Sequence, residues 1–148
     1  TLAHTEGHIF RAIMEGVCFG TESILDVMRQ QGFPPQEIVV SGGATRNRLW
    51  LQMHADVSNV PLTLTNVTEG PLLGSAMIAS VGLGAHPDLP TASRVMTSTA
   101  DVIEPDADAH EQYQAHYDLY RRTYPALKEL MAESTRLSAR RPEREKQA

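Results

Sequence analysis

The chain has 148 residues with a formal net charge of −5, and 41% of its residues are hydrophobic and 21% charged, as in a single globular domain. No apolar run reaches the ~20 residues of a membrane-spanning helix, and the acidic balance argues against broad attraction to nucleic acid. Cys18 is the only cysteine and no secretory signal opens the sequence. We therefore expect a cytoplasmic protein without membrane or nucleic-acid partners.

The first half of the chain predicts alternating helices and strands. Apolar residues recur every three or four positions from Glu6 to Gln31, which predicts a long helix with one core face. The β-branched run at 37–41 predicts a strand buried on both faces. Helical spacing at 45–59 and an alternating pattern at 60–67 predict a second helix and a second strand.

Further elements follow in the second half. Thr68 is placed to cap a helix that runs through Leu83 and has a face of small residues suited to close packing. A short helix is predicted at 91–96 and an extended piece at 102–104. A long helix should begin near Asp106. The order of elements predicts an α/β domain with a βαβα core and long flanking helices.

The last predicted helix carries an apolar stripe in steps of four and three, which favours packing over base stacking because no basic residues interleave with it. Its members are Tyr113, Tyr117, Tyr120, Tyr124, Leu127 and Met131. Pro125 lies inside the stripe and should kink or break the helix. The segment 134–148 is polar and is expected to be a disordered tail, which leaves residues 1–133 as the folded part.

A glycine turn carries the chemistry. The predicted strand at 37–41 leads into Gly42, Gly43 and Ala44, and Asn47 follows one turn later. Glycines let a ligand approach the backbone, and the start of the next helix offers free N–H groups to polar or anionic ligand atoms. Asn47 could bond a base or a sugar. The turn therefore predicts a nucleotide site, although a Gly-Gly turn is also an ordinary strand-to-helix connection.

Three blocks together resemble the FGGY family of carbohydrate kinases over about residues 2–132. HIFRAIME (8–15) is similar to the closing half of that family's second signature, so the chain is expected to begin inside the signature. GGATRNRLWLQMHADVSNVPL (42–62) resembles its Gly-Gly-x-x-x-N…Q…AD…P block, and EGPLLGSAMIASVGLG (69–84) resembles its small-residue helix. Pro71 and Leu72 depart from the usual pattern there, which leaves the subfamily open.

The resemblance implies the C-terminal, nucleotide-binding part of an ATP- and Mg²⁺-dependent kinase, with an actin-like, ribonuclease-H-like fold, that phosphorylates a ketopentose or polyol. It places adenosine beside Gly43, Ala44 and Asn47, with Gly42 as a neighbour. The aspartate that acts as general base would lie in the missing N-terminal domain, so we expect no catalytic residue here and no turnover by this chain alone. The full-length enzyme is expected to be a homodimer. Only two strands of a larger mixed sheet can be found.

Other readings compete with this one. The chain could be a non-catalytic, actin-like nucleotide-binding or regulatory module, or an inactive fragment. His4 and His8 lie one helical turn apart, but they lack a third ligand and are not expected to hold a metal. Asp106 should cap the final helix rather than begin a calcium loop. Cys18 is expected to be an inert, packed thiol.

Overall fold

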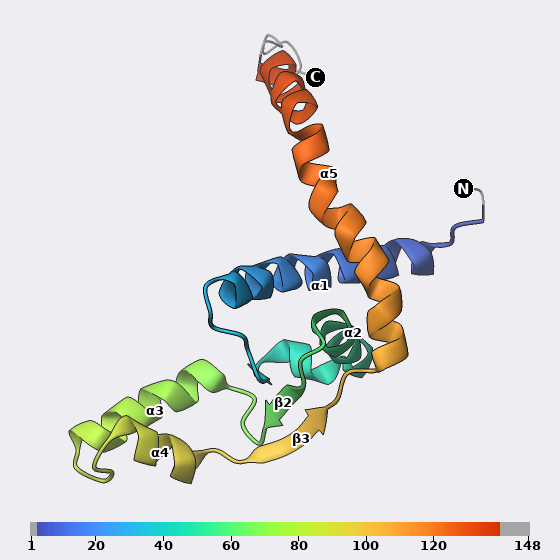
Figure 1. The fold of residues 1–148 in the computed structure, drawn as a ribbon. Helices are drawn as coiled ribbons and strands as arrows, with labels where there is room; N and C mark the ends of the chain where they lie inside the picture. The colour runs from blue at the N-terminus through green and yellow to red at the C-terminus, as the bar shows by residue number, and fades with distance from the viewer. Residues whose placement is uncertain (1–2, 140–148) are drawn as a thin grey trace, which may run out of the picture.

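The computed structural model describes residues 3–139. Within that range helices alternate with short strands along most of the chain, and one 3-10 helix follows the first strand (Figure 1). They are α1 (Glu6–Gln30), β1 (Ile38–Val40), η1 (Gly43–Arg46), α2 (Arg48–Ser58), β2 (Leu62–Thr65), α3 (Gly70–Gly82), α4 (Leu89–Met96), β3 (Thr99–Ile103) and α5 (Ala107–Ala139). The predicted α/β order is confirmed.

The described strands form one mixed sheet in the order β1-β2-β3. β1 pairs in parallel with β2, and α2 connects them, so the three elements form a βαβ unit. β2 pairs antiparallel with β3, and Leu62 lies opposite Ile103. The prediction of only two strands was wrong because β3 begins at Thr99. The sequence TADVI mixes polar and apolar residues, and only its end was recognised as extended.

β1 is not buried on both faces as predicted. Val39 is 58% exposed, whereas its neighbours Ile38 and Val40 pack against the cluster beneath α2. β1 is an edge strand of the described sheet, and of its three residues Val39 is the exposed one. A continuous β-branched run therefore has one buried and one open face here.

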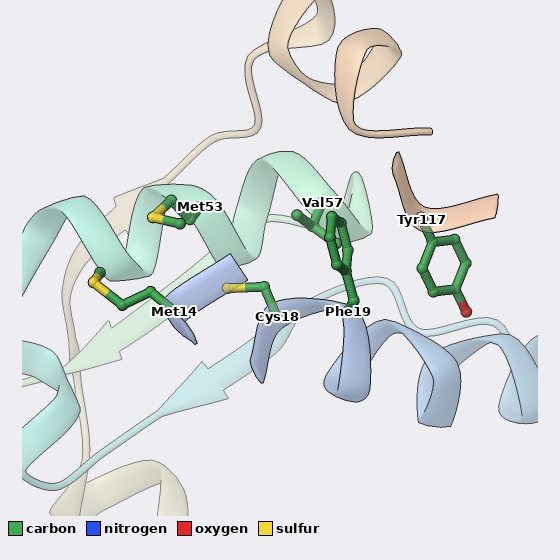
Figure 2. Close-up of a cluster of buried hydrophobic side chains, with 6 residues drawn as sticks. All are labelled: Met14, Cys18, Phe19, Met53, Val57 and Tyr117. Atoms are coloured by element: carbon green, nitrogen blue, oxygen red, sulfur yellow. The ribbon is translucent and has the colours of Figure 1, made fainter. Parts of the chain in front are cut away.

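Helix α2 lies between two hydrophobic clusters and holds the fold together. On one side, Leu51 and Ala55 pack with Leu62 and Ile103 of the sheet. On the other side, α2 meets α1 and α5 (Figure 2). The second cluster consists of Met14, Cys18 and Phe19 from α1, Met53 and Val57 from α2, and Tyr117 from α5. Cys18 is a packed core thiol, as predicted.

Only the first half of α5 packs on the body of the molecule. Tyr117 is buried and Tyr113 is partly buried against the α1–α2 cluster, but Tyr124 is 63% exposed. Beyond that point the helix stands clear of the other elements (Figure 1). The helix does not break at Pro125. It continues through 134–139, so the start of the predicted tail is helical. Residues 140–148 lie outside the described range.

Thr68 does not cap α3, contrary to the prediction. The helix begins at Gly70 with Glu69 in the cap position, and the Glu69 side chain makes no capping hydrogen bond. The Thr68 carbonyl instead accepts a hydrogen bond from the Gly42 N–H at 2.8 Å. Among the described residues α3 packs chiefly beside α4, and none of its residues is buried. Within this range no helix is long and apolar enough to cross a membrane.

Candidate functional site: the glycine turn

Gly42 adopts a backbone conformation that is essentially restricted to glycine. Its φ is 87° and its ψ is −164°, a region in which a Cβ is severely crowded. Both of its backbone polar groups are bonded. The N–H donates to the Thr68 carbonyl at 2.8 Å, and the carbonyl accepts from the Thr45 hydroxyl at 2.8 Å. Gly42 is therefore required by the shape of the turn.

Gly43 differs from its neighbour. It begins η1 without a positive φ. A Cβ built on Gly43 would meet nothing within 4 Å among the described atoms. The backbone at this position thus does not itself require glycine, and the missing side chain leaves open space in front of the turn. This is the arrangement expected where a ligand approaches the backbone.

Asn47 is the N-cap of α2. Its Oδ1 accepts a hydrogen bond from the Trp50 N–H at 3.2 Å. Because residues 43–46 form the tighter 3-10 turn, α2 begins at Arg48 rather than at residue 45 as predicted. The cap uses one of the two lone pairs of Oδ1, and the side-chain NH₂ group, which can only donate, is the group that we expect to contact a ligand.

The turn and α1 enclose a pocket of about 430 Å³. Gly43, Ala44 and Asn47 line one side together with Trp50, and Gly42 does not reach it. The opposite wall comes from α1 and consists of Phe10, Ile13, Met14 and Val17. Among residues 3–139, no charged residue lines this pocket. The structure therefore brings together three of the four predicted site residues in an apolar setting.

The α1 wall is the part of the site that sequence reasoning missed. Its residues were predicted to belong to the core face of the first helix, yet Phe10 is 64% exposed and Ile13 and Val17 are also exposed. One signal was available in the sequence: apolar residues occupy more of the circumference of α1 than one core face requires. A helix of that kind has a second surface to cover.

A second pocket of about 340 Å³ adjoins the first and shares Ala44 and Trp50 with it. His54 lies in this second pocket, and burial lowers its pKa. Burial also raises the pKa of the nearby Cys18 thiol to about 12. The thiol therefore stays protonated at neutral pH and is a poor nucleophile.

The remaining candidates have structural roles. His8 Nδ1 accepts from the Thr5 N–H at 3.1 Å at the start of α1. Asp106 caps α5 as predicted, because its Oδ1 accepts from the Ala109 N–H at 2.9 Å. In residues 3–139 no three His, Cys, Asp or Glu side chains gather in a way that could hold a metal ion.

A family profile for the C-terminal domain of the FGGY family of carbohydrate kinases matches residues 1–83. A xylulose kinase of Staphylococcus epidermidis is 31% identical over 130 residues, which are 88% of this chain and 26% of that protein. A ribulokinase of Mycolicibacterium smegmatis is 37% identical over 112 residues, which are 75% and 20% of the two chains. The chain thus spans about a quarter of the length of these relatives.

Solved structures agree on the fold. The xylulose kinase from Rhodospirillum rubrum superposes with a TM-score of 0.76 at 30% identity, over 88% of this chain and 26% of that one. A glycerol kinase from Plasmodium falciparum, solved with ADP, gives a TM-score of 0.69 at 20% identity over 83% and 25%. The α/β architecture is that of an actin-like ATPase domain, as predicted.

Proposed function

The chain belongs to the FGGY family of carbohydrate kinases, and we propose that it is the ATP-binding C-terminal part of a kinase that transfers the γ-phosphate to a hydroxyl of a ketopentose or polyol. The xylulose kinases and the ribulokinase among its relatives support that substrate class. The general base and most sugar contacts would come from the rest of the longer protein. We further propose that the full-length enzyme is a cytoplasmic homodimer.

One observation carries the nucleotide assignment: Gly43, Ala44 and Asn47 line the same apolar pocket. A purine needs flat, apolar walls and a few placed polar groups. Phe10 and Met14 of α1 provide apolar walls. The Asn47 NH₂ group can donate a hydrogen bond to a ring nitrogen or a ribose oxygen. Gly43 leaves the backbone open where the base or ribose would lie.

The phosphates and Mg²⁺ would lie outside this pocket. The described residues that line it carry no charge, so it suits the adenosine rather than the phosphates. Mg²⁺ is usually held by one or two carboxylates together with the substrate phosphates. We therefore propose that the metal is carried by ATP and by residues of the longer protein.

The experiment separates the two roles of Asn47. In the full-length protein, Asn47→Asp keeps the helix cap, because aspartate caps as well as asparagine, but it removes the NH₂ donor. Adenosine and ATP should then bind roughly 5- to 100-fold more weakly, as for a lost buried hydrogen bond, while sugar affinity should not change. Calorimetric titration with each ligand measures this.

Asn59→Asp is the matched control. Asn59 is the C-cap of the same helix, so this variant adds the same charge at the end remote from the pocket and should bind adenosine normally. Equal losses for adenosine and sugar with Asn47→Asp, or no loss for adenosine, would refute the assignment. Normal ATP binding without phosphorylation of any sugar or polyol would favour the non-catalytic module.

A further inference from the structure

The glycine turn is held from behind by the segment that connects β2 to α3, residues 66–70. The carbonyl of Thr68 accepts the Gly42 N–H at 2.8 Å. Two positions later, Gly70 lies so close to Ser41 that a Cβ at Gly70 would be 2.6 Å from Ser41 Oγ and 3.3 Å from Ser41 Cβ. Gly70 has no positive φ, so its own backbone does not require glycine.

The connecting segment cannot easily retreat from such a contact. The Asn66 N–H donates to the Ser98 carbonyl at 3.0 Å, and Asn66 Oδ1 accepts from the Ser98 N–H at 3.0 Å. Thr65 Oγ1 also donates to the Val67 carbonyl at 2.8 Å. The two Asn66 bonds anchor the segment to Ser98, just before β3, and the Thr65 bond holds the start of the segment together.

The other side of the contact leads directly to the proposed adenosine site. Ser41 immediately precedes Gly42, and Gly43 and Ala44 follow. Ser41 is exposed, so its hydroxyl can rotate away from an added methyl group, but its Cβ is fixed to the backbone. A methyl group on Gly70 would therefore push the Ser41 backbone, and with it the turn that lines the pocket.

We propose that Gly70 is a positioning residue for the nucleotide: its missing side chain allows Ser41 to sit against the start of α3, and this contact sets where Gly43 and Ala44 face the ligand. The inference rests on the proposed function, because the turn matters for binding only if adenosine lies in the pocket. The inference extends the set of residues that determine nucleotide binding to Gly70, which does not itself line the pocket.

The test uses Gly70→Ala in the full-length protein, with adenosine as the probe. We expect roughly tenfold weaker binding, from overpacking at the contact. Two double variants should then rescue binding in steps. Adding Ser41→Ala to Gly70→Ala removes only the hydroxyl and should restore part of the adenosine affinity. Adding Ser41→Gly also removes Cβ, so this double variant should bind adenosine as tightly as the Ser41→Gly single variant. Gly74→Ala on the same helix is the matched control, because a Cβ there meets nothing within 4 Å of described atoms.

A second readout does not depend on nucleotide. Hydrogen exchange of the Gly42 amide should be faster in Gly70→Ala, and the Ser41→Gly combination should return it to the rate of Ser41→Gly alone. Normal exchange in Gly70→Ala, no rescue, or an equal loss in Gly74→Ala would overturn the proposal. Failure of the unmodified protein to bind adenosine would instead overturn the proposed function, while the exchange rates would still decide whether Gly70 positions the turn.

Discussion

The two faces of α1 have different surroundings. Met14, Cys18 and Phe19 are buried against α2 and α5. Next to this buried face, Phe10 and Ile24, at 64% and 65% exposure, are covered by nothing comparable within the described residues. A helix whose apolar arc is wider than one core face needs has a further apolar surface to cover. α1 therefore has a second apolar surface, and the proposed adenosine pocket opens on it.

The sheet also has an open face. Val39 of β1 points away from the α2 cluster and is exposed, and β1 is an edge strand of the described sheet. Large apolar patches and unpaired strand edges favour association. We call the side chains packed around α2 the covered face, and the exposed apolar side chains of α1 and β1 the open face. The covered face should determine the stability of the fold. The open face should determine how the chain associates in solution and what it binds.

The largest expected effect is on association. We expect the isolated 148-residue chain to self-associate and to unfold over a broad temperature range, because its open face exposes apolar side chains. Sedimentation velocity at several concentrations measures association. The double variant Ile13→Gln and Ile24→Gln, at two exposed positions, should shift the distribution toward monomer. A monomeric, sharply melting original chain would contradict the role given to this face.

A core substitution tests the covered side of α2. Leu51 is 2% exposed, and Leu51→Ala should lower the free energy of unfolding by about 2–5 kcal/mol through the cavity it leaves. Ile24→Ala should change it by less than about 0.5 kcal/mol. Urea denaturation of the same chain gives both values. Similar costs at the two positions would mean that the face of Ile24 is covered in solution, and the contrast between the faces would be lost.

The sequence predicted the covered side better than the open side. Helical periodicity located α1, α2 and α5, because side chains three and four positions apart share a face. Periodicity alone could not assign Phe10 and Ile13 to a pocket rather than to the core, because both uses need the same residue types. Likewise, the β-branched run of β1 predicted two buried faces, and only the sheet order shows that Val39 lies on an open one.

The part of the site that is formed by residues close together in the sequence could be predicted. The order strand, glycine pair, helix placed Gly43, Ala44 and Asn47 together, and they do line one pocket. The different roles of the two glycines depend on φ values that the sequence does not specify. The closeness of Gly70 to Ser41 depends on how the β2–α3 connection folds back, a long-range contact that no local pattern records.

The adjacent glycines give the next contrast. Gly42→Ala should destabilise the chain by about 1–3 kcal/mol, because alanine rarely adopts its conformation. Gly43→Val should leave the fold intact and abolish nucleotide binding, because its side chain would enter the pocket. Circular dichroism and calorimetric titration with ADP separate the two outcomes. If Gly43→Val unfolds the protein, glycine is needed at this position for the backbone conformation, and the hypothesis that it makes room for a ligand fails.

On the covered side, Tyr117 joins α5 to α1. Its hydroxyl donates to Asp26 Oδ2 at 2.7 Å, and burial raises its pKa to about 12, so it remains a neutral donor. Tyr117→Phe should cost about 1 kcal/mol of unfolding free energy, as for one hydrogen bond. Tyr124→Phe, on the exposed half of α5, should cost nothing measurable. Equal effects in urea denaturation would show that the Tyr117 bond adds no stability.

The smallest expected effect is a pH dependence from Glu22, which is buried on the covered side and pairs with Arg29 at 2.6 Å. Burial raises the pKa of Glu22 above its ordinary value of 4.5, although the hydrogen bond from Arg29 opposes this. The folded protein then holds this proton more tightly than the unfolded chain. Its contribution to the free energy of unfolding should therefore fall as pH rises from about 4.5 through the raised pKa.

Glu22→Gln isolates this contribution, because glutamine keeps an oxygen for Arg29 but does not titrate. Other carboxyl groups, such as Asp88 and Asp101, have lowered pKa values and give the opposite trend, so the difference between the two proteins is the informative quantity. The unfolding free energy of the original chain minus that of Glu22→Gln, from urea titrations between pH 4 and 7, should decrease with pH. A difference that rises with pH would mean that the attraction of Arg29 outweighs the cost of burial, and that this ion pair stabilises the covered face.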